Sequence, residues 1–150
     1  MASTLPSDCR VVPFEESFRT DVKTLWEACG LTRPWNDPGK DIDRKLSDPV
    51  GRLFLLLKTV ERKERVIGTV MAGYDGHRGS VYYLGIDPKH QGAGYGRVLM
   101  DHVEQFLLAL GCPKINLFVR KGNDAATSFY EKLDFAEDNS LVLGKRLIPD

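Results

Sequence analysis

The sequence predicts one α/β domain whose central sheet contains both parallel and antiparallel strands. Its strand-like and helix-like segments follow one another in the order β-α-α-β-β-β-α-β-α-β, which is typical of a mixed α/β fold. The strand–helix–strand unit over residues 81–119 should be parallel and right-handed. A chain of 150 residues can also bury a core without support from a metal or a disulfide.

The first half of the chain supplies three of the strands and two helices. Residues 1–8 are expected to form a disordered lead, so that the domain spans residues 9–150. Apolar side chains at helical spacing predict a helix over residues 15–29, and a shorter helix is expected over 41–46. The strands are predicted at residues 10–14, 52–60 and 65–74, the second of them buried on both faces because residues 53–57 are all apolar.

The second half supplies the other three strands and two more helices. A turn over residues 75–79 leads into a strand over 81–86, where Gly85 indicates a bulge or the close approach of a ligand. The remaining predicted elements are a helix over 98–110, a strand over 113–119, a helix over 124–132 with Asn123 as its N-cap, and a last strand over 141–148. Leucines on that last strand (Leu141, Leu143, Leu147) are compatible with a homodimer.

Charge and composition argue against several classes of partner. Lys plus Arg and Asp plus Glu both number 21, whereas a nucleic-acid or membrane-surface partner would usually require a basic excess. Three scattered cysteines indicate reduced thiols, and the chain has neither a membrane-length apolar run nor a signal-peptide pattern, so we expect a cytoplasmic protein. His90 and His102 lack the spacing of metal ligands, so no metal site is expected.

A glycine-dense loop joins the strand over residues 81–86 to the following helix. Backbone N–H groups at a helix start have no intrahelical partner, and the helix dipole adds positive charge there, so this loop should bind phosphate. The loop does not match a Walker-type phosphate loop, which needs Lys and then Ser or Thr after its last glycine, because Arg97 follows Gly96. It does not match a dinucleotide-binding loop either, which would need glycine at position 97. We therefore expect a phosphate-bearing cofactor at Gln91, Gly92, Ala93, Gly94, Tyr95, Gly96 and Arg97.

Two blocks of the sequence resemble the GNAT family of N-acetyltransferases. The spacing Q-x-x-G-x-G at residues 91–96 is similar to the acetyl-CoA loop of that family. The second block resembles the pattern N-x-x-A-x-x-x-Y-x-x-x-G-F through Asn123, Ala126, Tyr130 and Phe135, with Asp134 in place of the usual glycine. The resemblance covers residues 10–148, and segments 33–38, 74–79 and 143–147 are similar to the bacterial YpeA-type branch.

The resemblance implies an acetyl-CoA-dependent N-acetyltransferase that acetylates a primary amine of a small molecule, amino acid or peptide by direct attack in a ternary complex. It also implies a GNAT-like sheet whose central parallel strands splay apart to admit the pantetheine arm. The backbone of Leu84 and Ile86 would pair with that arm, and the Leu84 N–H would donate to the thioester oxygen. Tyr130 matches the family's usual acid, and Asn123 matches a residue that contacts the cofactor.

Three features remain open at this stage. The strand over residues 81–86 has no acidic residue where many family members carry a glutamate, so Asp75, His77 or a water held by Tyr82 and Tyr83 could accept the amine proton. The acceptor site is expected to be walled by the loop over residues 33–38 and by the turn over residues 75–79, with contacts from Arg33, Trp35, Asn36, Asp37 and Tyr82. Alternatively, prolines at 34 and 38 could simply stiffen that loop. Alternative functions are a catalytically silent acyl-CoA-binding sensor and a nucleotide-binding domain unrelated to CoA.

Overall fold

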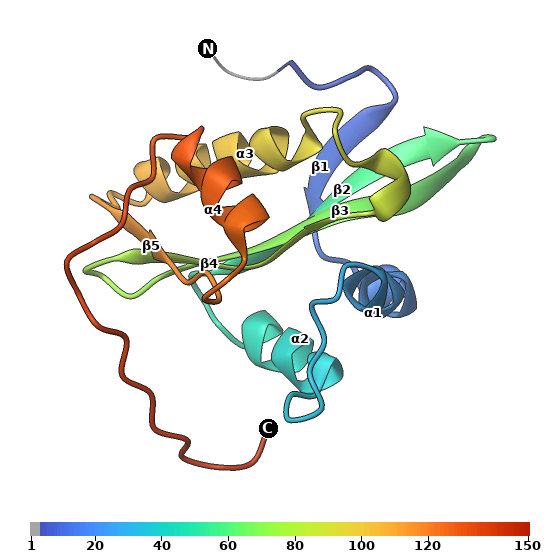
Figure 1. Ribbon diagram of the computed structural model, residues 1–150. Helices are drawn as coiled ribbons and strands as arrows, with labels where there is room; N and C mark the ends of the chain where they lie inside the picture. The colour runs from blue at the N-terminus through green and yellow to red at the C-terminus, as the bar shows by residue number, and fades with distance from the viewer. Residues whose placement is uncertain (1–3) are drawn as a thin grey trace.

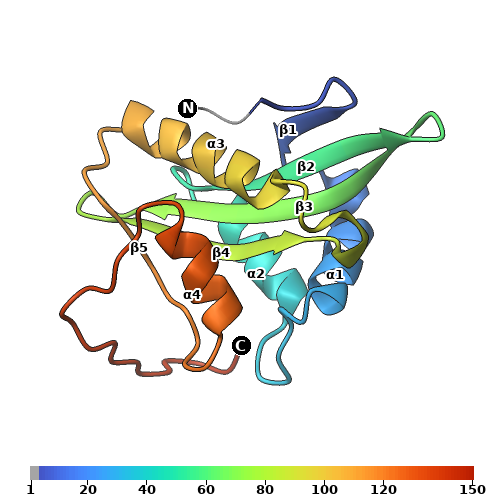
Figure 2. The same ribbon diagram turned by 45° about the horizontal axis from the view of Figure 1, so that its top comes forward.

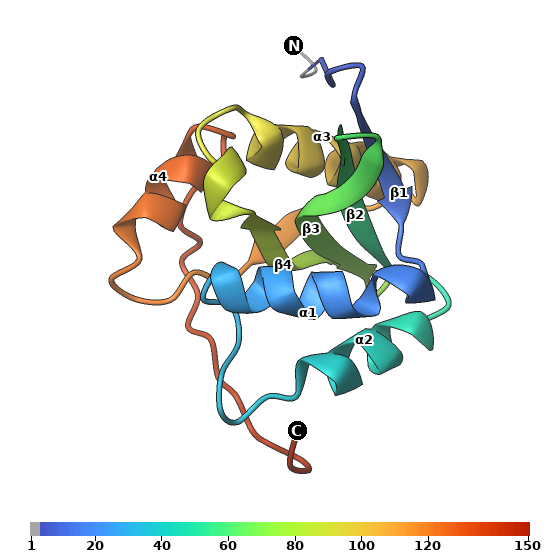
Figure 3. The same cartoon turned by 90° about the vertical axis from the view of Figure 1, so that its right-hand side faces the viewer.

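The computed structural model describes residues 4–150 as a five-stranded sheet between two layers of helices (Figure 1). Helices α1 (Arg19–Ala28) and α2 (Pro38–Leu46) cover one face, and α3 (Tyr95–Ala109) and α4 (Asp124–Glu131) cover the other (Figure 3). The strands are β1 (Cys9–Pro13), β2 (Arg52–Val60), β3 (Lys63–Tyr74), β4 (Gly79–Ile86) and β5 (Ile115–Leu117), with short 3₁₀ turns η1 (Glu16–Phe18) and η2 (Pro88–His90). None of the helices in the described residues has the length and apolar character needed to cross a lipid bilayer.

The apolar run of β2 anchors both layers of the core. Leu53, Leu55 and Leu57 pack toward α1 and α2, whereas Phe54 and Leu56 pack toward α3. This alternation follows from the two-residue period of a strand, and it confirms that β2 is buried on both faces. Each fully buried leucine contributes roughly 1.5–3 kcal/mol relative to an exposed one.

Side-chain caps and glycine set the helix starts. The Asp37 carboxylate accepts the N–H groups of Gly39 (2.8 Å) and Lys40 (3.2 Å), so α2 begins at Pro38, three residues before the predicted position 41. The Asn123 side chain accepts the Ala126 N–H (3.2 Å), which confirms the predicted N-cap of α4. Gly94 precedes α3, which also starts three residues earlier than the predicted position 98.

The sheet order β1-β2-β3-β4-β5 is antiparallel up to β4 and parallel between β4 and β5. The parallel pairing covers only residues 79–81 against 115–117, and β4 then continues to Ile86. In Figure 2 the chain after β5 runs away from β4, and α4 follows it. The predicted splay of the central parallel strands is therefore confirmed, and it opens the sheet beside residues 82–86.

The prediction of a last strand over residues 141–148 is wrong. Residues 141–148 form no strand and lie on the surface, where Leu141 and Leu143 are 91% and 90% exposed. An alternating pattern becomes a strand only where a partner edge accepts it, and β5 has only three paired residues. The observed order is thus β-α-α-β-β-β-α-β-α, and the homodimer stays a prediction.

The N-terminal segment also differs in part from the expected disordered lead. Residues 1–3 lie outside the described part of the chain. Leu5 packs against the α3-side core, and the Asp8 carboxylate pairs with the Lys58 ammonium at 2.7 Å. Residues near the start of the domain therefore make defined contacts before β1 begins.

Candidate functional site

The glycine loop has the backbone shape of an anion site. Gly92 and Gly94 have φ of 81° and 86°, a left-handed conformation that glycine adopts without strain. Gly94 is the N-cap of α3, and no side chain among residues 4–150 caps that helix start. A Cβ on Gly92 or Gly94 would meet nothing within 4 Å, so the space before the helix start is open. These observations fit a phosphate held by the backbone N–H groups of residues 95–97.

The other loop residues have structural tasks that the sequence did not reveal. The Gln91 side-chain amide donates to the Ile86 carbonyl (3.0 Å) and ties the loop to the end of β4. Tyr95 is buried on the core side, with its hydroxyl 3.3 Å from the Lys58 ammonium, so only its backbone faces the loop. The Arg97 guanidinium donates to the Lys132 carbonyl (3.1 Å) and joins α3 to the end of α4.

Gly96, the last glycine of the loop, also allows α3 and α4 to pack closely. A Cβ at this position would lie 3.0 Å from the ring of Phe129, so only glycine lets α4 approach the start of α3 this closely. Gly85 is explained in the same way. A Cβ there would lie 2.8 Å from Leu31 and 3.2 Å from the Cys29 sulfur. The groups that approach Gly85 closely are therefore side chains of the α1–α2 connection and not the ligand that the sequence suggested.

The bulge predicted for this strand is present, at Tyr83 and Leu84. Thr69 of β3 pairs with Gly85 and Met71 pairs with Tyr82, so the register shifts between them. Tyr83 has φ of 52°, which is rare for a large side chain. Val81 and Leu84 both pack toward α3, whereas Tyr83 packs toward α1. The extra residue thus changes which way the backbone and side chains of β4 point.

The backbone amides of Leu84 and Ile86 face the splayed side of β4. The Asp87 N–H donates to the Ile67 carbonyl of β3 at 2.8 Å. Successive N–H groups of a strand point to opposite edges, so the Ile86 N–H points away from β3, and so does the Leu84 N–H two residues earlier. The structure therefore aims both predicted amides at the opening between β4 and β5.

Tyr130 lies on α4, the helix that follows this opening. Its ring packs edge-on against Phe129 and Phe135, with ring centroids 5.1 Å and 5.6 Å away. Burial raises the pKa of Tyr130 to about 12, so the hydroxyl keeps its proton at neutral pH. Asn123 uses its side-chain oxygen as the cap of the same helix.

Asp75 and His77 are not brought together with Leu84. They lie in the β3–β4 turn, and the five residue-to-residue steps from Gly79 to Leu84 span about 16 Å of strand. The Asp75 carboxylate accepts the N–H groups of His77 and Arg78, both at 2.7 Å. The Arg78 and His77 N–H groups hold the pKa of Asp75 below its usual value, which makes this carboxylate a weaker base.

A pocket of about 470 Å³ lies on the α2 face of β4. Tyr82 is the one predicted acceptor residue that lines it, and its ring stacks on Phe118 with centroids 5.9 Å apart. Asp75, Arg78 and Gly79 of the predicted 75–79 turn also line it. The sequence did not single out the lining residues near the end of α2 and along β5 and its continuation, which are Lys45, Asp48, Asn116 and Phe118. Lys45 in the last turn of α2 and Asn116 on β5 are far apart in the sequence, and no local pattern indicates that they line the same pocket.

The loop over residues 33–37 lies outside this pocket. Arg33 donates to the carbonyls of Gly30 and Thr32, and Asp37 caps α2. Trp35 is 53% exposed, and the centroid of its ring lies 5.8 Å from the guanidinium of Arg120, a residue of the β5–α4 connection. Asn36, once its amide is oriented to satisfy its partners, donates to the Asp150 carboxylate.

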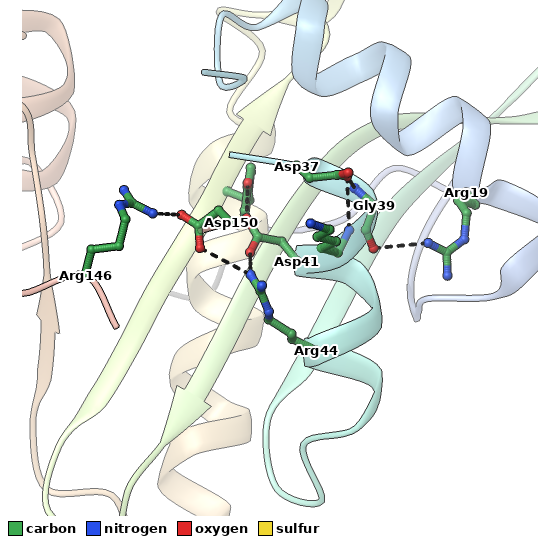
Figure 4. Close-up of polar contacts among 9 residues, drawn as sticks. Arg19, Asp37, Gly39, Asp41, Arg44, Arg146 and Asp150 are labelled. Atoms are coloured by element: carbon green, nitrogen blue, oxygen red, sulfur yellow. Dashed lines mark hydrogen bonds and ion pairs between the residues drawn. The ribbon is translucent and has the colours of Figure 1, made fainter. Parts of the chain in front are cut away.

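The end of the chain returns to α2 through a line of charged groups (Figure 4). The Asp41 carboxylate accepts a hydrogen bond from the Tyr83 hydroxyl (2.5 Å) and lies 3.4 Å from the Arg44 guanidinium. Arg44 also lies 3.4 Å from Asp150, which pairs with Arg146. The side chain of Tyr83 is therefore connected through α2 to the C-terminal segment.

Comparisons with known proteins agree with this geometry. The model of the acetyltransferase (GNAT) family matches residues 16–135. The acetyltransferase YE1169 of Yersinia enterocolitica is 50% identical over 138 residues, which are 91% of this chain and 94% of that protein.

Solved structures share the fold at low identity. An aminoglycoside acetyltransferase from an uncultured soil metagenomic sample, crystallised with trehalose, has a TM-score of 0.73 at 19% identity over 94% of this chain and 97% of its own. The ribosomal-protein-S18-alanine N-acetyltransferase of Escherichia coli has a TM-score of 0.71 at 22% identity over 87% of this chain and 79% of its own. The chain belongs to the acetyltransferase (GNAT) family, whose members transfer an acetyl group from acetyl-CoA.

Proposed function

We propose that this N-acetyltransferase acetylates a primary amine of a small molecule, amino acid or peptide by direct attack in a ternary complex. The observation that carries the proposal is the position of β4 between two separate openings. The glycine loop and α4 belong to the α3 face, and the 470 Å³ pocket with Tyr82 belongs to the α2 face. Two substrates could therefore meet at the bulge from opposite faces of the sheet.

The glycine loop would hold the cofactor's phosphates through backbone N–H groups. Open space at Gly92 and Gly94 and the uncapped start of α3 support this role. The amides of Leu84 and Ile86 would pair with the pantetheine arm at the open side of β4. We expect a Kd in the micromolar range, or roughly −8 kcal/mol of binding free energy.

Acetyl-CoA supplies an activated acetyl group as a thioester. The Leu84 N–H would stabilise the negative charge that grows on the acetyl oxygen, a contribution of about 10²- to 10³-fold in rate for one such donor. Tyr130 would give its proton to the leaving sulfur, because a tyrosine hydroxyl is protonated at neutral pH. Burial raises its pKa and so makes it a weaker acid than a free tyrosine, and the role rests on its match to the family's usual acid and on its place on α4.

The amine must lose a proton before it attacks, because a free amine of pKa near 10.4 is mostly charged at neutral pH. We propose that water beside Tyr82 accepts that proton, since Tyr82 lines the pocket two residues from Leu84. Tyr83 is a poorer partner for such water because its hydroxyl already donates to Asp41.

The balanced charge and the free thiols support a cytoplasmic location.

A screen for CoA thiol release tests the proposal. One arm uses small amines, including aminoglycosides, and the other uses peptides with free N-terminal or lysine amines, because the two structural neighbours are named for acceptors of these two kinds. Turnover with one class assigns the acceptor. Acetyl-CoA binding without turnover in either arm would favour the silent sensor, and tight ATP binding without CoA binding would overturn the cofactor assignment.

A further inference from the structure

The β4 bulge is held by a side chain of the neighbouring strand. Thr69 of β3 is fully buried, and its hydroxyl donates to the Tyr83 carbonyl at 2.8 Å. The same hydroxyl accepts the indole N–H of Trp26 from α1 at 2.8 Å. A threonine hydroxyl has a single proton, and an indole nitrogen can only donate. Trp26 therefore directs the one proton of Thr69 to the Tyr83 carbonyl.

The ring of Tyr83 is fixed as well. It stacks on the fully buried ring of Trp26, with centroids 3.8 Å apart and planes 15° apart. Its hydroxyl donates to Asp41 of α2 at 2.5 Å. A residue held at φ of 52° needs surroundings that determine its conformation, and Tyr83 has them on β3, α1 and α2.

The carbonyl of Tyr83 and the N–H of Leu84 belong to one peptide unit. That unit is planar and trans, so its C=O and N–H point in opposite directions. A hydrogen bond that fixes the Tyr83 carbonyl toward Thr69 also fixes the Leu84 N–H away from it. This direction agrees with the alternation of amides that follows from the Asp87–Ile67 bond.

We infer that Thr69 is a positioning residue for acetyl transfer: its buried hydroxyl, oriented by Trp26, holds the Tyr83–Leu84 peptide so that the Leu84 N–H meets the acetyl oxygen. The inference rests on the proposed role of the Leu84 N–H. Thr69 acts only through that peptide, because its side chain lies between Trp26 and Tyr83.

The test compares Thr69→Val, which keeps the shape and removes the hydroxyl, with Thr69→Ser, which keeps the hydroxyl. We expect Thr69→Val to lower kcat about 10- to 100-fold and to leave the KM for acetyl-CoA within about threefold, because only the donor's direction is lost. Thr69→Ser should recover most of kcat. Equal loss in both variants, or a wild-type kcat in a folded Thr69→Val protein, would overturn the inference.

A second measurement does not depend on turnover. The ¹H–¹⁵N signal of the Leu84 amide should move in Thr69→Val without cofactor, and its change on adding acetyl-CoA should be lost, while Thr69→Ser resembles wild type. If wild type transfers no acetyl group but this signal behaves as stated, the proposed function fails and the positioning role stands. An unchanged Leu84 signal in Thr69→Val refutes the role.

Loss of the Thr69 hydroxyl leaves the Trp26 N–H buried and unpaired, which could prevent folding. The double variant Trp26→Phe with Thr69→Val removes that N–H, and Trp26→Phe alone is its matched control. The double variant lacks the hydroxyl that donates to the Tyr83 carbonyl, whereas the Trp26→Phe control keeps it. We therefore expect kcat to fall further in the double variant than in the control. Equal kcat in these two proteins would also overturn the inference.

Discussion

Replacing Gly94 with valine should weaken acetyl-CoA binding while leaving a folded protein. Gly94 has φ of 86°, and a Cβ there would meet nothing within 4 Å, so the change adds backbone strain without a clash. A β-branched residue avoids this conformation, at a cost of about 1–3 kcal/mol when it is forced to adopt it. The free loop should therefore relax to negative φ and turn its N–H groups away from the phosphate position.

Binding would then have to restore the strained conformation. A penalty of about 1–3 kcal/mol raises Kd roughly 5- to 150-fold, and a side chain in the open space would add to it. Calorimetric titration with acetyl-CoA measures this change directly, and circular dichroism checks that the variant is folded.

Gly111 offers a matched control for strain alone. It has φ of 81° and the same open surroundings, and it follows α3 at the end opposite the glycine loop. The 15 residues of α3 separate the two sites by about 22 Å. Gly111→Val should lower the melting temperature and leave Kd unchanged. An unchanged Kd in Gly94→Val, or an equal rise in both variants, would refute the assignment of the loop.

Three further changes test the site and its supports. Tyr130→Phe should lower kcat about 10²-fold or more and leave acetyl-CoA affinity within about twofold, because it removes only the proton donor; an unchanged kcat contradicts the acid role. Gly96→Ala should destabilise the fold by about 1–3 kcal/mol in urea unfolding, since the new Cβ would lie 3.0 Å from the Phe129 ring. The Lys40 and Gly39 N–H groups lower the pKa of Asp37, so its contribution to stability is present above the unfolded pKa near 4 and is lost as pH falls through the lower folded value. Asp37→Asn should therefore show a shallower fall in melting temperature below pH 4 than wild type; identical pH profiles would argue against this cap.

Local patterns in the sequence predicted most of the helices and strands, the strand buried on both faces and the glycine loop. The left-handed conformations of Gly92 and Gly94 follow from a short glycine-rich stretch, and the cap of α4 follows from Asn123 itself. These features depend on neighbours within a few residues, which is why they can be read from the chain.

Features that depend on distant partners could not be predicted. Gly85 indicated a bulge in β4, but its centre at Tyr83 and its support by Thr69 and Trp26 depend on other elements. The pocket proposed for the acceptor takes Lys45 from the end of α2 and none of the loop residues around Trp35. The last predicted strand contains apolar residues, but among the described residues it pairs with no other strand.

The return of Asp150 to α2 has a practical consequence for recombinant work. An affinity tag added after this residue would start beside Arg44, on the same layer as the proposed acceptor pocket. The opposite end of the described chain packs at Leu5 on the α3-side core. An N-terminal tag is therefore the better choice for kinetics, because it keeps the added residues away from the layer that holds the proposed acceptor pocket.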